Sequence, residues 1–115
     1  MVDERREYFR FSTSWRARVL LADRSLHQVV VTDVSKGGLA IEFPHMLALG
    51  TPVNIEFIAP HRGGRVALRA KTVVTHHTLL SGGRGARLGL KFLIMDKDNS
   101  HTFSNILQEL TDKLG

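Results

Sequence analysis

Six short runs in which apolar and polar residues alternate, followed by one run of helical period, constrain the fold of this chain more than any other feature. In the fourth run, Val53, Ile55 and Phe57 fall on one side, while Asn54 and Glu56 fall on the other. Alternation with period two is typical of half-buried strands, and the turn residues between the runs favour antiparallel pairing. The runs span residues 15–22, 26–34, 38–43, 52–59, 64–77 and 86–94.

The last segment of the chain changes period. Phe103, Ile106, Leu107, Leu110 and Leu114 recur at spacings of three and four residues, which gives one apolar stripe on a helix. Acidic and hydroxyl residues precede the stripe and offer N-caps. The sequence therefore predicts a mainly β protein, a six-stranded antiparallel β-barrel closed at one end or edge by a C-terminal helix over about residues 97–113.

Size and composition limit the classes of protein that remain. The chain has 115 residues, 43% of them apolar, which is enough for one core. It has no cysteine, which excludes disulfides and cysteine-based sites, and its apolar runs are too short for a signal peptide or a membrane span. We expect a cytoplasmic protein with a flexible N-terminal arm over residues 1–13 and a barrel domain over residues 14–115.

The positive charge is concentrated and rich in arginine. The net charge is +5, and 11 of the 16 basic side chains are Arg. Arginine makes planar contacts with phosphates and base edges, whereas lysine supplies a point charge. An anionic partner is one interpretation of this composition, and a solvated basic surface is the other.

Two short segments carry chemistry that the scaffold does not need. The first contains Arg5, Arg6 and Arg10 ahead of the first predicted strand, and the second is the stretch Asp33–Val34–Ser35–Lys36–Gly37–Gly38. Asp33 and Ser35 are two positions apart and would project from the same face of an extended segment. Taken alone, the first segment is also typical of a solvated tail and the second of an ordinary turn.

Together the two segments resemble the PilZ domain. Arg6 and Arg10 match its RxxxR motif, and Asp33, Ser35 and Gly38 match its DxSxxG motif. The stretches Leu49–Val53 and Leu88–Phe92 look like later blocks of the same family. The resemblance covers roughly residues 4–110 and follows the expected order of elements.

The resemblance implies a small barrel that binds cyclic di-GMP, a bacterial second messenger, and passes the binding on to a downstream effector protein. Carried onto this chain, Arg6 and Arg10 would contact phosphate and guanine edges. Asp33 and Ser35 would contact a guanine, and Gly38 would leave space. A basic residue at the place of Arg5 favours an intercalated cyclic di-GMP dimer in this family. We expect the ligand to order the N-terminal arm against the turn at residues 33–38.

Other functions are open to a small basic barrel. It could bind single-stranded nucleic acid by charge and stacking, but Phe43, Phe57 and Phe92 fall in phase with the predicted core and not with an exposed face. A PilZ-like module that only contacts proteins is a further alternative. We expect no enzyme, because no nucleophile and acid–base set is apparent, and no metal, because His76 and His77 would point to opposite faces of a strand.

Overall fold

The computed structural model describes residues 9–114 and confirms the predicted strands and helix. β1 begins at Phe11, within the residues 1–13 expected to form the arm. α1 ends at Leu114, one residue beyond the expected end. The elements are β1 (Phe11–Leu20), β2 (Leu26–Ser35), β3 (Gly38–Phe43), β4 (Pro52–His61), β5 (Gly64–Leu79), a 3-10 turn at Ser81–Gly83, β6 (Ala86–Ile94) and α1 (Lys97–Leu114).

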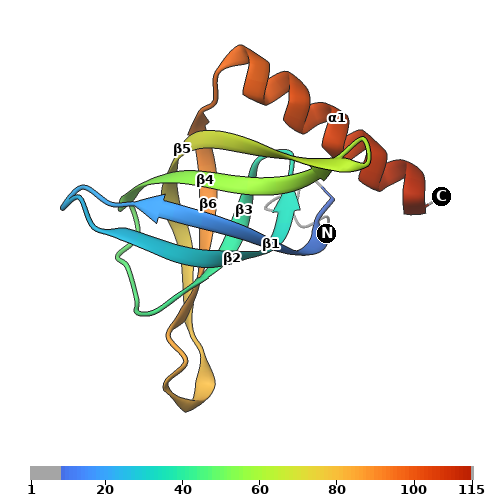
Figure 1. Cartoon of the computed structure of the whole chain (residues 1–115). Coiled ribbons are helices and arrows are strands. Elements are labelled where there is room, and N and C mark those ends of the chain that lie inside the picture. The colour runs from blue at the N-terminus through green and yellow to red at the C-terminus, as the bar shows by residue number, and fades with distance from the viewer. Residues whose placement is uncertain (1–8, 115) are drawn as a thin grey trace, which may run out of the picture.

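The six strands form one antiparallel sheet in the order β1–β2–β3–β6–β5–β4, and β1 pairs with β4 to close the barrel (Figure 1). The closing seam is short, from Ala17–Leu20 on β1 to Asn54–Phe57 on β4. By contrast, β4 and β5 pair along their whole common length, from Pro52 to His61 on β4. The hairpin of β5 and β6 extends well beyond the barrel wall (Figure 1).

The core lies inside the barrel and follows the alternation in the sequence. Val53, Ile55 and Phe57 are all buried, with Phe57 fully enclosed, and Phe43 is buried as well. Phe92 is partly buried against the same core. The aromatic residues therefore pack with the aliphatic ones inside, as the phase of the pattern predicts.

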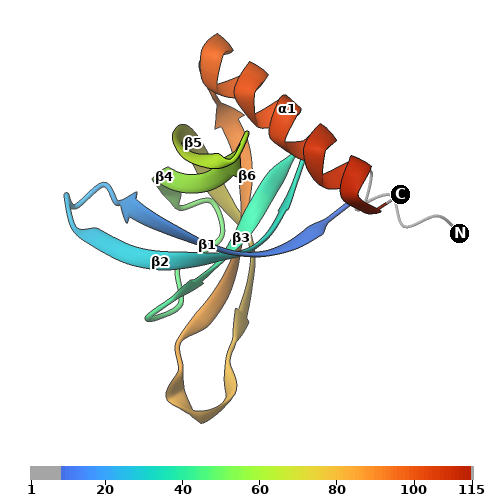
Figure 2. The same cartoon turned by 45° about the vertical axis from the view of Figure 1, so that its right-hand side comes forward.

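The helix α1 lies across one end of the barrel (Figure 2). Its buried residues are Phe103 and Ile106. The Phe103 ring packs edge-on against Phe57 at 5.7 Å and against Phe92 at 5.3 Å between ring centroids. Such contacts add to the burial of apolar area, so the apolar stripe holds the helix over the barrel end.

The start of the helix is fixed by side-chain hydrogen bonds. The Asp96 carboxylate accepts the backbone N–H of Asn99 at 2.8 Å, which is an N-cap bond, and the Asn99 amide oxygen accepts the N–H of Arg69 on β5 at 2.8 Å. The hydrogen bonds from Asn99 lower the pKa of Asp96, since they favour the charged carboxylate. Within residues 9–114, no helix combines the length and apolar content needed to cross a membrane.

Candidate functional site

A β-bulge in β2 aims the acidic motif residue at the outer surface of the barrel. Val31 pairs with Ile41 and Val34 pairs with Leu39, and all four side chains face the core. The register between β2 and β3 shifts after Val31, so Thr32 is an extra residue in the strand. The shift changes the phase of the alternation and places Asp33 on the outer face, as bulges commonly do beside functional sites.

Asp33 sits between two arginines from distant parts of the chain. Arg10 Nη1 donates to Oδ1 at 2.7 Å, and Arg87 Nη2 donates to Oδ2 at 2.6 Å. The side chain of Asp33 is 12% exposed, while those of Arg10 and Arg87 are 37% and 48% exposed. A nearly buried carboxylate thus accepts one charge-assisted hydrogen bond on each oxygen, from two guanidinium groups that reach solvent.

The two arginines reach Asp33 from outside its own cross-strand row. That row runs Ser12, Asp33, Ala40, Gly89 and His76 across five strands. By contrast, Arg10 precedes β1, and Arg87 belongs to the next row, opposite Glu42. Both contacts therefore reach across from neighbouring positions and depend on the length of the arginine side chains.

Ser35 and Gly38 lie at the hairpin where β2 turns into β3. They pair in the register, and Ser35 is 6% exposed. The Ser35 hydroxyl donates to the Gly38 carbonyl oxygen over 3.4 Å, a long contact that is easily replaced. The sequence motif therefore places Asp33 and Ser35 on one face, as their spacing predicts.

The need for glycine at position 38 comes from the fold itself. A Cβ at this position would overlap the carbonyl oxygen of Leu90 on β6. Gly38 therefore permits the close pairing of β3 with β6, which carries Arg87 into the site. Its predicted role in leaving space for a ligand is a separate matter and stays a prediction.

Small residues lie beside Asp33 on the outer face of the sheet. Ala40 and Gly89 follow it in the row, and a Cβ at Gly89 would lie 3.1 Å from the Cβ of His76. The row between Asp33 and His76 therefore carries no long side chain, and Ala40 beside Asp33 is itself buried.

Arg5 and Arg6 lie outside the described residues, so of the predicted arginines only Arg10 can be placed. Arg87 is the residue that sequence reasoning missed. Its signal was the alternation of residues 86–94, which puts Arg87 and Lys91 on the face opposite Leu88 and Leu90. Within the described part of the chain, no three His, Cys, Asp or Glu side chains gather in a way that could hold a metal ion.

The chain is thus a six-stranded barrel capped by a C-terminal helix, with an aspartate bound by two arginines near the β2–β3 hairpin. A model of the PilZ domain matches residues 4–109, and the chain belongs to the PilZ domain family. No curated protein matches the chain.

Solved structures share this fold at low sequence identity. The chain is similar to the Bacillus subtilis inhibitor of motility MotI/DgrA, with a TM-score of 0.77 and 13% identity over 96% of this chain and 53% of that one. It is also similar to Escherichia coli YcgR in complex with c-di-GMP, with a TM-score of 0.76 and 22% identity over 96% of this chain and 47% of that one. The chain thus spans about half the length of these two proteins.

The PilZ domain of E. coli YcgR with c-di-GMP has a TM-score of 0.62 and 22% identity, and here the match covers 96% of this chain and 98% of that one. At these identities the likeness shows the fold alone.

Proposed function

We propose that this chain is a receptor for cyclic di-GMP, bound on the outer face of β2, β3 and β6. The single observation that carries the proposal is the Asp33 carboxylate, nearly buried and held between Arg10 and Arg87. Membership of the PilZ family and the c-di-GMP complexes of neighbouring folds support this ligand.

The residues suit the chemistry of this ligand. An ionised carboxylate only accepts hydrogen bonds, so Asp33 suits the N–H donors of guanine. The contacts to Asp33 use Nη1 of Arg10 and Nη2 of Arg87, and each guanidinium has five N–H donors in all. The remaining donors can take a phosphate or the O6 and N7 edge of guanine, while the Ser35 hydroxyl adds a polar contact.

Transmission in this proposal runs through the N-terminal arm. Arg10 lies one position before β1, so a ligand that engages Arg10 acts directly on the segment that precedes the barrel. Arg5 and Arg6 on the same arm would contact the nucleotide, and Arg5 would admit an intercalated dimer. The new arrangement of the arm would present a changed surface to an effector protein.

Calorimetric titration of the whole chain with cyclic di-GMP tests the receptor. We expect saturable binding, about tenfold or more weaker in Arg6→Ala or Arg10→Ala at an unchanged Tm of the free protein. Absence of binding heat at about tens of micromolar ligand would refute the proposal. A dissociation constant in that range corresponds to a binding free energy of about −6 to −7 kcal/mol. Two ligands per chain, falling to one in Arg5→Ala, would support the dimer.

Hydrogen exchange followed by mass spectrometry tests the arm. We expect peptides that cover the residues before β1 to exchange more slowly once cyclic di-GMP is added. Unchanged exchange together with a positive titration would reject the ordering mechanism and leave the receptor intact.

Binding of single-stranded nucleic acid is the rival function. It predicts a strongly salt-dependent affinity for oligonucleotides. Such an affinity, without any heat from cyclic di-GMP, would replace the proposal.

A further inference from the structure

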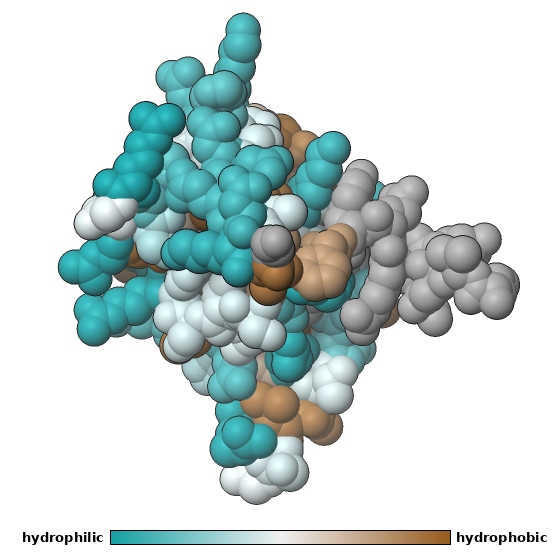
Figure 3. All heavy atoms as spheres, turned by 90° about the vertical axis from the view of Figure 1, so that its right-hand side faces the viewer, coloured by the Kyte–Doolittle hydropathy of each residue, from teal (hydrophilic) through white to brown (hydrophobic). Residues whose placement is uncertain are grey.

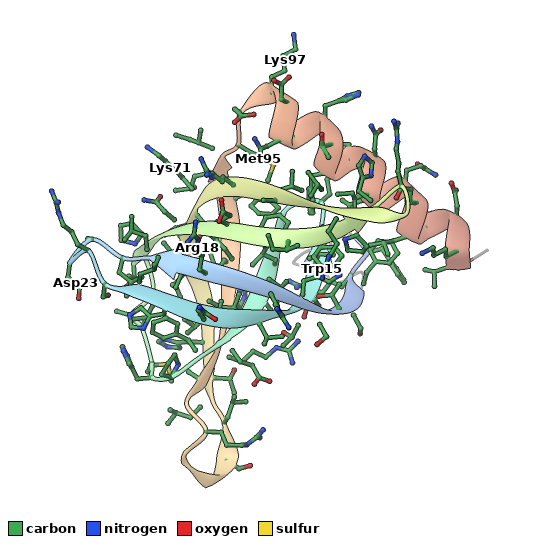
Figure 4. All side chains as sticks on the ribbon, viewed as in Figure 1. Trp15, Arg18, Asp23, Lys71, Met95 and Lys97 are labelled. Carbon is green, nitrogen blue, oxygen red and sulfur yellow. The ribbon has the colours of Figure 1, made fainter. Side chains whose placement is uncertain are left out.

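A hollow on another part of the barrel's outer face shares no residue with the candidate site. Its volume is about 570 Å³, and strands β1, β2, β4, β5 and β6 all contribute to its lining. Figure 4 shows Arg18 on β1 and Lys71 on β5, which line the same groove on the side of the barrel near the start of α1. We call this hollow the β1–β5 groove.

The groove consists of two neighbouring cross-strand rows. One row is charged and runs Arg18, Glu56, Arg69 across β1, β4 and β5. The other row is mainly apolar and runs Leu26, Leu20, Asn54, Lys71, Ile94 from β2 to β6. The apolar strip of this row is made of Leu26 and Leu20 at one end and Ile94 at the other, with Asn54 and Lys71 between them.

The apolar strip is open to solvent. Leu20 is 42% exposed, Leu26 is 58% exposed and Ile94 is 61% exposed. Large aliphatic side chains that gather on one surface mark an interaction site more often than scattered ones do. By comparison, the face seen in Figure 3 is mostly hydrophilic, and its apolar side chains form small separate groups.

The charge of the groove is positive. Arg18 Nε and Arg69 Nε each donate to one Glu56 oxygen at 2.8 Å, so one carboxylate balances only one of these two cations. Lys71 lines the same groove, and Arg16 lines a smaller adjoining hollow that shares Arg18 and Glu56. Asp96 is the other acid of the groove, and Asn99 binds it without balancing its charge. The basic residues Arg18, Arg69 and Lys71 therefore exceed the acidic residues of the groove by one.

We infer that the β1–β5 groove docks an acidic amphipathic segment of a partner protein. The aliphatic face of such a helix would cover Leu20, Leu26 and Ile94, while its carboxylates would meet Arg16, Arg69 and Lys71. The positive charge of the groove favours acidic residues in the partner segment, and the exposed aliphatic side chains favour apolar residues on one face of the same segment.

A protein segment fits these walls better than a nucleic acid strand does. Single strands bind largely by stacking on aromatic rings, and among the described residues that line the groove none is aromatic. Leucine-like side chains of a protein segment would instead bury Leu20, Leu26 and Ile94, and this burial of apolar area is favourable.

Peptide selection on the immobilised full chain tests the inference. The probe is a display library of random peptides of about 16 residues, which is about four helical turns. We expect enriched peptides that carry leucine-like residues three and four positions apart with Asp or Glu between them. The best of these, made synthetically with a fluorophore, is then titrated by anisotropy.

Four variants locate the binding. Leu26→Asp and Ile94→Asp each weaken the peptide about tenfold or more, since each puts a charge into the apolar strip. Matched changes off the groove, Leu79→Asp on the β5–β6 hairpin and Lys113→Glu on α1, leave affinity within about twofold, because exposed sites away from an interface contribute little. All four residues are exposed, and circular dichroism verifies that each variant folds.

Specified results overturn the inference. They are a library without enrichment, enriched peptides without acidic residues, or a titration that Leu26→Asp and Ile94→Asp do not change. Equal competition by a thymidine oligonucleotide or by phosphatidylglycerol vesicles would assign the groove to a nucleic acid or a membrane. A dimer of the wild type that Leu26→Asp converts to monomer would assign it to a second copy of the chain. Failure of cyclic di-GMP to bind leaves all these readouts untouched.

Discussion

Two regions of the barrel surface each place one carboxylate between two arginines, yet the two clusters differ in what holds them. Glu56 and its partners Arg18 and Arg69 are neighbours in one cross-strand row, so the strand register itself brings them together. Asp33 is met by Arg10 and Arg87, neither of which belongs to its row. The first cluster is part of the sheet, whereas the second is assembled across it by long side chains.

This difference bears on how firmly each cluster is held in place. Register holds the Glu56 cluster in place whether or not a ligand is present. The Asp33 cluster is held by side-chain contacts across rows, so we expect an anion to take over its arginines while the sheet stays intact. Two salt-bridged triads of the same composition are thus expected to differ in how easily a ligand rearranges them.

The largest expected effect comes from the backbone beneath the Asp33 cluster. Gly38→Ala would drive a methyl group into the Leu90 carbonyl and destabilise the fold by about 3 kcal/mol. Thermal unfolding should show a fall in Tm of about 10 °C or more. Gly64→Ala, where an added Cβ lies 3.8 Å from its nearest neighbour, is the control, and an equal loss there would remove the distinction between the two regions.

The next effect is on the ligand. Asp33→Ala should weaken cyclic di-GMP by about 30-fold, or about 2 kcal/mol, because guanine loses its acceptor. Glu56→Ala should change the affinity by less than about twofold, since surface charges away from a site have little influence on it. Calorimetry measures both. If the two variants weaken binding equally, the two clusters are not functionally distinct.

Arg87 offers a sharper version of the same contrast. Its loss in Arg87→Ala should cost about tenfold in affinity for cyclic di-GMP, the value of one good polar contact to a base or phosphate. Arg69→Ala removes an arginine from the other cluster and should leave the titration unchanged. A wild-type affinity in Arg87→Ala would restrict Arg87 to orienting Asp33.

The smallest effect concerns pH. Hydrogen bonds from Arg69 and Arg18 lower the pKa of Glu56 below its ordinary value of 4.5. A depressed pKa means that the stabilisation is present above that ordinary value and is lost as pH falls through the lower pKa of the folded state. Urea unfolding of the wild type and of Glu56→Gln should therefore differ by less than about 1 kcal/mol at neutral pH and converge in acid. A constant difference across this range would contradict the assignment.

The sequence predicts the fold in detail because local pattern and packing agree. The alternation of Val53, Ile55 and Phe57 marks the core face of β4, and the stripe through Phe103 and Ile106 marks the buried face of α1. Each of these patterns depends on residues close together in the chain. These patterns can therefore be recognised in the sequence without knowing which residues lie opposite them in the sheet.

The candidate site was only partly predictable, because its contacts are long-range. The motif spacing correctly puts Asp33 and Ser35 on one face, but no local pattern reveals the bulge at Thr32 that turns this face outward. Arg87 lies 54 positions from Asp33, so the alternation shows that it faces outward and not which carboxylate it meets. The fold supplies that pairing.

The short seam between β1 and β4 has a consequence for how the barrel is made. Residues that meet across it lie far apart in sequence, as Arg18 and Glu56 do at a separation of 38 positions. The entropy of closing such a loop opposes its early formation, whereas the β4–β5 hairpin can form from neighbours. The barrel is therefore expected to close last, after the local hairpins have formed, and the ion pair of Arg18 with Glu56 then joins the two strands of the seam.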